Sequence, residues 1–178
     1  MGRNRRFQAE EINLLARSME VAEERVSEHF RLSDESWRRY PYEVRTLAEL
    51  LPQEVSREAL AQVLRLRRPA GAKQIRGKDF YRICLQDHNL LGLVRREGED
   101  GLLLPLLTYV LVHELVHVMR FYRYEHLFEA SADERRAEEA RVHAIAGEIL
   151  RPVRLPEMDR VLNLYAVHAD SVAGASWC

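Results

Sequence analysis

Apolar residues recur at spacings of three and four along most of the chain, which is the pattern of amphipathic helices. In residues 7–30 these positions share one face and charged residues cover the other, so we expect a helix there. The same pattern predicts a short helix around Trp37 and longer helices over residues 42–51, 55–66, 103–122, 132–150 and 158–168.

One stretch in the middle of the chain is typical of strands. In residues 79–96, aromatic and β-branched residues flank Asp87-His88-Asn89, which suggests a short hairpin. The preceding residues 67–78 contain a proline, two glycines and several cations, and we expect a loop. The patterns together predict one mostly helical α+β domain over residues 1–178. Residues 1–66 form its helical N-terminal part, and a small sheet or hairpin precedes the long helix.

Composition and charge narrow the classes of partner. The chain has 178 residues, of which 47% are hydrophobic, enough for one core. Its 27 basic and 28 acidic residues leave a net charge of −1, so we expect neither nucleic acid nor an anionic membrane as a partner. The N-terminus lacks the apolar run of a secretory signal, and a cytoplasmic location is expected. The two cysteines, Cys84 and Cys178, are too few for a zinc ribbon.

Residues 102–119 are long and apolar enough to be considered as a membrane span. The stretch nevertheless contains His113, Glu114 and His117. A glutamate inside a bilayer is costly without partners, and the chain has no second span to supply them. We therefore expect a buried helix of a soluble protein.

The same predicted helix contains the residues that indicate a metal site. His113-Glu114-Leu115-Val116-His117 is an H-E-x-x-H sequence, for which this composition gives only about 0.03 chance occurrences. On a helix, positions i and i+4 project from one face, so both imidazoles can reach one metal ion with Glu114 beside it. Burying these groups among valines and leucines costs several kcal/mol unless they are paired or bind a metal.

A catalytic zinc site needs a third protein ligand. In the predicted helix over residues 132–150, Glu138 and Glu139 both lie about 50° from the centre of the apolar face, so helical geometry does not separate them. We favour Glu139, because His143 is its i+4 neighbour and can support it. Glu138 and His143 remain the alternatives.

These residues resemble the gluzincins, the thermolysin-like zinc metallopeptidases, in which a later helix supplies a glutamate ligand. Here Glu139 follows His117 at a similar separation along the chain, although His143 stands where gluzincins often have an acidic residue. The phrase EEARVHAIAGEILRP is also loosely similar to the glutamate helix of ImmA/IrrE-type proteases. The resemblance implies a zincin-like domain with its metal-site core in residues 79–152 and Zn2+ held by His113, His117 and Glu139.

The implied activity is hydrolysis of a peptide or protein substrate by a metal-activated water. Glu114 would be the general base, and an additional donor would stabilise the oxyanion. For that donor we favour His168 over Tyr122, Tyr124, His126 and Tyr165. An edge strand over residues 80–86 would pair with the substrate. A plain core strand is an equally good interpretation of these residues. The alternative function is a metal-stabilised regulatory or protein-binding module with little peptidase activity.

Overall fold

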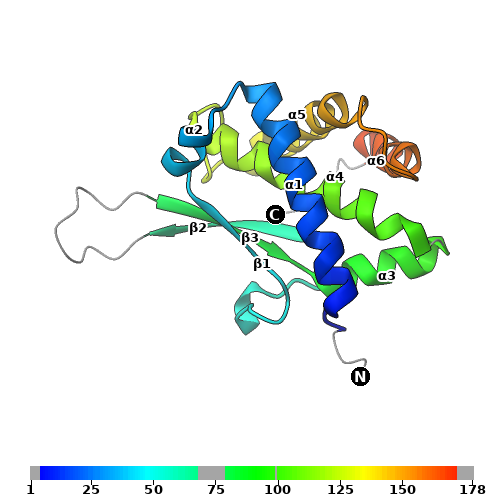
Figure 1. The fold of residues 1–178 in the computed structure, drawn as a ribbon. Coiled ribbons are helices and arrows are strands. Elements are labelled where there is room, and N and C mark those ends of the chain that lie inside the picture. Colours follow the sequence, from blue (N-terminus) through cyan, green and yellow to red (C-terminus); the bar gives the residue numbers. More distant parts are fainter. Residues whose placement is uncertain (1–4, 68–78, 99, 172–178) are drawn as a thin grey trace.

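The computed structural model describes residues 5–67, 79–98 and 100–171, with side chains left out at 79, 100 and 167–171. Six α-helices, three strands and two 3-10 helices follow one another along these residues (Figure 1). In chain order they are α1 (Ala9–Phe30), α2 (Asp34–Arg39), β1 (Tyr42–Arg45), η1 (Pro52–Glu54), β2 (Ala61–Arg67), β3 (Asp79–Leu85), α3 (Asp87–Glu97), η2 (Asp100–Leu102), α4 (Leu103–Tyr122), α5 (Ala132–Leu150) and α6 (Met158–Ser171).

The three strands form one mixed sheet in the order β1-β3-β2. β1 runs parallel to β3, with Val44 opposite Ile83, and β2 runs antiparallel to β3, with Val63 opposite the same residue. The middle strand carries fully buried residues, as expected for a strand covered on both faces. β1 and β2 are therefore the edges of the described sheet.

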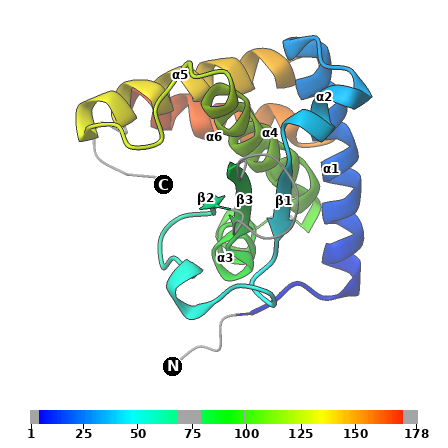
Figure 2. The same ribbon diagram turned by 90° about the vertical axis from the view of Figure 1, so that its left-hand side faces the viewer.

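Helix α4 is the centre of the molecule. Eighteen of its 20 residues are buried, because α1, α5, α6 and the sheet all pack against it (Figures 1 and 2). A helix that is apolar all round is stable in water only when it is enclosed in this way. Among the described helices, α4 alone is long and apolar enough to cross a membrane, and 94% of that stretch is buried inside the fold. This confirms the expectation of a buried core helix.

The helices over residues 7–30, 103–122 and 132–150, and the short one around Trp37, are confirmed, and α6 begins where the last one was expected. The capping box at the start of α5 shows why that boundary was predictable. Ser131 Oγ accepts the Glu134 backbone N–H, and the Glu134 carboxylate accepts the Ser131 N–H. This reciprocal cap fixes where α5 starts and therefore which of its later residues face α4.

The helices predicted over residues 42–51 and 55–66 are wrong, so the N-terminal part, residues 1–66, is not purely helical. It supplies β1 and most of β2. In β2, burial alternates at Ala61, Gln62 and Val63, which is the period of a strand rather than of a helix. Both segments pair with β3, and this pairing stabilises them as strands although their apolar residues have helical spacing.

Of the hairpin predicted over residues 79–96, the first strand is confirmed as β3. The second strand is wrong, because helix α3 stands in its place. The polar residues at the expected turn instead anchor the start of that helix. Asp87 accepts the backbone N–H groups of Phe7 and Leu47, and Asn89 donates to the Ala59 carbonyl. Of the two possibilities for residues 80–86, the edge strand is wrong and the core strand is confirmed, because β3 lies between the other two strands. Of the loop predicted over residues 67–78, Arg67 ends β2 and the rest lies outside the described residues.

Replacing Asp87 tests this anchor. We expect Asp87→Ala to lower the free energy of unfolding by about 2–4 kcal/mol, because two buried backbone donors lose their acceptor. Urea denaturation would measure the loss. The control is Asp34→Ala at an exposed helix start, which should change stability by less than about 0.5 kcal/mol. Equal effects of the two substitutions would contradict the role given to Asp87.

Candidate metal centre

His113 and His117 lie one turn apart on the face of α4 that meets α5. Both are 4% exposed, and their Nε2 atoms are 3.2 Å apart. They belong to a ladder of rings at successive i+4 positions, with Tyr109 before them and Phe121 after them. The ladder holds both imidazole rings in place, so the two Nε2 atoms face a common point.

Glu139 of α5 reaches the same point. Its carboxylate oxygens lie 3.3 Å from His113 Nε2 and 3.0 Å from His117 Nε2. Ligand atoms around a tetrahedral zinc, at about 2.1 Å from the ion, are separated from one another by about 3.4 Å. The distances start from both carboxylate oxygens, one to each imidazole, and all are close to this separation. One small divalent ion could therefore be held among the three side chains.

The electrostatics of the group are those of a cation site. Burial alone would raise the pKa of Glu139, but its hydrogen bonds to His113 and His117 hold that pKa well below its ordinary value. Burial would lower the pKa of His117, and the bond to Glu139 raises it instead. The Nδ1 atoms of both histidines are buried and have no hydrogen-bond partner among the described residues. An ionised carboxylate facing two imidazole nitrogens suits a divalent cation.

Glu138, the first alternative for the third ligand, points elsewhere. It is 3% exposed, and its carboxylate forms a two-pronged ion pair with Arg120 of α4. Arg120 also contacts Glu125, at 2.6 Å. The two adjacent glutamates of α5 thus have different partners on α4: Glu138 faces the arginine and Glu139 faces the histidines.

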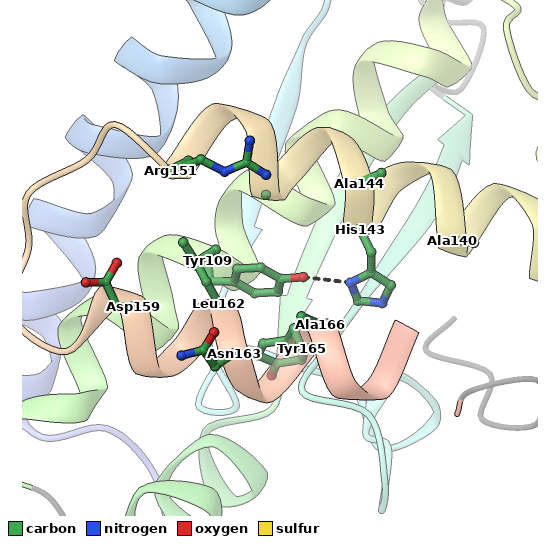
Figure 3. A pocket seen from close by; sticks show the side chains of 11 residues that line it. Tyr109, Ala140, His143, Ala144, Arg151, Asp159, Leu162, Asn163, Tyr165 and Ala166 are labelled. Atoms are coloured by element: carbon green, nitrogen blue, oxygen red, sulfur yellow. Dashed lines mark hydrogen bonds between the residues drawn. The ribbon is translucent and has the colours of Figure 1, made fainter. Parts of the chain in front are cut away.

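His143, the second alternative, lies beside the group. A ligand atom from each of His113, Glu139 and His143 can be chosen so that all three lie within 4.8 Å of one another, and this set can hold a metal ion. His143 Nδ1 is 2.6 Å from the hydroxyl of Tyr109 (Figure 3). That bond orients the imidazole of His143, as partners of metal-binding histidines commonly do.

Glu114 lies next to His113 on α4 and is 5% exposed. Burial raises its pKa, and the charges of the two neighbouring histidines act in the opposite direction. The residue borders two cavities. The β2–α5 cavity, about 200 Å3, is also lined by Val63, Leu64 and His117. The water-sized cavity, about 20 Å3, is also lined by His113, His143 and Tyr165.

Two of the predicted oxyanion donors border these cavities. Tyr165 of α6 lines the water-sized cavity, and His126 lines the β2–α5 cavity. Tyr122 instead donates to the Pro41 carbonyl, and Tyr124 is 86% exposed. The favoured candidate, His168, belongs to α6, but its side chain lies outside the described residues.

Sequence reasoning missed Tyr109 and Arg120, which orient this group from α4. Tyr109 stacks on Tyr165 at 4.1 Å between ring centroids and contacts His143, whereas Arg120 holds Glu138. A signal for both was present: each is a polar side chain within one turn of the H-E-x-x-H residues in an otherwise apolar helix. Only the packing of α5 and α6 reveals their partners.

Comparison of the chain with known protein families, with curated proteins and with solved structures found no match. The chemistry of the site must therefore be inferred from its own residues.

The ion pair between α4 and α5 can be tested by substitution. We expect Arg120→Met to lower the free energy of unfolding by about 3–5 kcal/mol, because it leaves the Glu138 carboxylate buried without its main partner. Chemical denaturation would measure this. The double variant Arg120→Met/Glu138→Leu should regain most of the loss, since no buried charge remains.

The matched control is Arg136→Met, which breaks an exposed ion pair with Asp133 on α5. Exposed pairs contribute at most about 1 kcal/mol, so this variant should stay near the wild type. An Arg120→Met variant as stable as Arg136→Met would show that the buried pair does not hold the two helices together.

Proposed function

We propose that the protein is a zinc-dependent hydrolase of peptide bonds. The observation that carries the proposal is the convergence of His113, His117 and Glu139 within 3.3 Å of one another, beside the buried carboxylate of Glu114. Two imidazoles and one carboxylate form the ligand set of a catalytic zinc with one position left open.

A zinc ion held by these three residues would act as a Lewis acid and would activate water near neutral pH. In this proposal Glu114 would accept and donate the proton. Glu114 lines the water-sized cavity, which has room for one water molecule. It would accept a proton from that water as the oxygen attacks the carbonyl carbon, and would pass it to the nitrogen of the leaving amine.

Other side chains of the chain would support the reaction. Tyr165 and His126 border the two cavities that Glu114 also lines, one in each, and each carries a donor for the oxygen of the scissile carbonyl. β2, rather than the strand first expected, is the edge strand beside the site. Its residues Ala61 and Val63 line the same two cavities, so an extended peptide could pair with this edge.

The alternative function, a metal-stabilised binding or regulatory module, is favoured by one observation. His143 lies close enough to His113 and Glu139 to supply a further ligand atom. Four protein ligands close a zinc site and are typical of structural rather than catalytic zinc. The two functions therefore differ in whether His143 is needed to hold the ion.

Metal content separates these possibilities. We expect about one zinc per chain in protein purified without chelators, and its loss in His113→Ala, His117→Ala and Glu139→Ala. At a zinc concentration a thousandfold above Kd, the ion should add about 4 kcal/mol to the free energy of unfolding, and a chelator should remove it. Elemental analysis and thermal denaturation would measure both effects.

The exposed Glu148→Ala on the same helix is the control and should keep its zinc. His143→Ala should also keep its zinc if the site is catalytic. A loss of zinc in His143→Ala as large as in His113→Ala would favour the structural site instead. Retention of zinc by all three ligand variants would contradict the assignment of the ligands.

Catalysis is tested by Glu114→Gln. We expect this variant to bind zinc as the wild type does and to lose peptide hydrolysis by a factor of at least about a hundred, because the amide cannot accept the proton of the attacking water. The measurement is turnover of a mixed peptide library by mass spectrometry, with Glu148→Gln as the control. An unchanged rate in Glu114→Gln would exclude the mechanism.

A further inference from the structure

The candidate metal centre is hidden inside the fold. His113 and His117 are each 4% exposed, and the side chain of Glu139 is 12% exposed. The β2–α5 cavity, which Glu114, His117 and Glu139 line, has a volume of about 200 Å3. Ligand sites in proteins usually have volumes of about 300–1,000 Å3, so this cavity is too small for a substrate of several residues. A part of the fold must therefore move before such a substrate can reach these side chains.

A larger space lies on the other side of one wall of this cavity. We call it the aromatic pocket. It has a volume of about 470 Å3 and shares Phe121, His126 and Phe128 with the β2–α5 cavity. Phe121 belongs to α4, whereas His126 and Phe128 belong to residues 123–130 between α4 and α5, which we call the α4–α5 loop. Leu127 of the same loop also lines the aromatic pocket. The loop therefore forms part of the wall between the small cavity and the larger pocket.

The α4–α5 loop is anchored near both ends. Near its start, the Glu125 backbone N–H donates to the Arg120 carbonyl, and the Glu125 carboxylate is 2.6 Å from the Arg120 guanidinium. After its end, the capping box at Ser131 fixes the start of α5. Residues 126–130 between these anchors belong to no helix or strand, and the Glu129 side chain is 80% exposed. The middle of the loop can therefore move without unfolding either helix.

Arg65 of β2 contacts the middle of the loop in two ways. Its Nη2 donates to the Glu129 carboxylate at 2.8 Å, and its guanidinium lies over the Phe128 ring, 5.4 Å from the centroid. The ion pair is at the surface, because the Glu129 side chain is exposed. Exposed ion pairs and cation–π contacts are individually weak. They can therefore hold the loop closed and still let it open within the microseconds to milliseconds that are typical of enzyme lids.

We propose that the α4–α5 loop is a lid over the metal centre and that Arg65 is its latch. When the two contacts of Arg65 break, His126 and Phe128 move out of the shared wall. The β2–α5 cavity and the aromatic pocket then become one space with room for a substrate. This inference rests on the metal centre of the proposed function but not on hydrolysis, because a chelator needs the same opening to reach a bound ion.

The experiment measures zinc exchange in the full chain. Protein loaded with zinc is mixed with an excess of the coloured chelator pyridylazoresorcinol, and the rate of zinc transfer is followed by absorbance. We expect Glu129→Gln to raise this rate by about threefold, because an exposed ion pair is lost. Arg65→Ala should raise it by about tenfold, because the contact with the Phe128 ring is lost as well. The double variant Arg65→Ala/Glu129→Gln should match Arg65→Ala, since both substitutions remove the same ion pair.

Zinc uptake separates a lid from a change in the site itself. A lid controls entry and exit alike, so uptake should accelerate by the same factor as release. Neither latch contact includes a proposed ligand of the ion, so Kd should stay within about twofold of the wild-type value. The matched control is Arg136→Ala, which breaks an exposed ion pair within α5 and should change neither rate.

Two results would overturn the lid and leave the proposed function standing. One is zinc exchange in Arg65→Ala that is as slow as in Arg136→Ala. The other is faster release from Arg65→Ala with Kd raised by the same factor, which would show that Arg65 supports the ligands of the ion instead. A wild-type protein that binds no zinc even when zinc is added would overturn the metal centre, and with it both the proposed function and the lid.

Discussion

The buried ion pair between Arg120 and Glu138 sets the relation between α4 and α5. It joins two charged side chains that are only 6% and 3% exposed, at a place where neither could remain without the other. Because Glu139 directly follows Glu138, the same pair determines where the second carboxylate of α5 goes. It lies opposite His117 and His113, which are about one and two turns back from Arg120 along α4. The candidate metal centre therefore depends on a contact that includes none of the side chains proposed to hold the ion.

Much of the site could be predicted from the sequence because it depends on helical periodicity. The two histidines of an H-E-x-x-H sequence face one way on any helix, and the capping box at Ser131 determines the start of the helix that carries Glu139. The choice between Glu138 and Glu139 was different. Both lie equally near the apolar face of α5, and what separates them is Arg120, a residue of another helix. No pattern within α5 contains that information.

The fold was less predictable where elements are short. β1 has four residues, too few for an alternating pattern to stand out from helical spacing. β2 was missed although its burial alternates at Ala61 and Val63, because its identity depends on β3, which follows it in the chain. The polar residues at 87–89 looked like a turn, but Asp87 accepts backbone hydrogen bonds from residues 40 and 80 positions away. In each case the sequence showed the local residues but did not show the distant segment with which they pair.

Those distant partners also govern how the chain folds. Helix α1, near the N-terminus, packs mainly on α4. Strand β1 has no neighbouring strand until β3 has been made. Long segments of the chain must close into loops before these contacts form. The entropy lost in closing them slows folding. During synthesis, α1 emerges with its apolar face uncovered well before α4 begins, because α2, all three strands and α3 are made in between. Until α4 emerges, that face is exposed to water, so the N-terminal part of the nascent chain is prone to non-native apolar contacts.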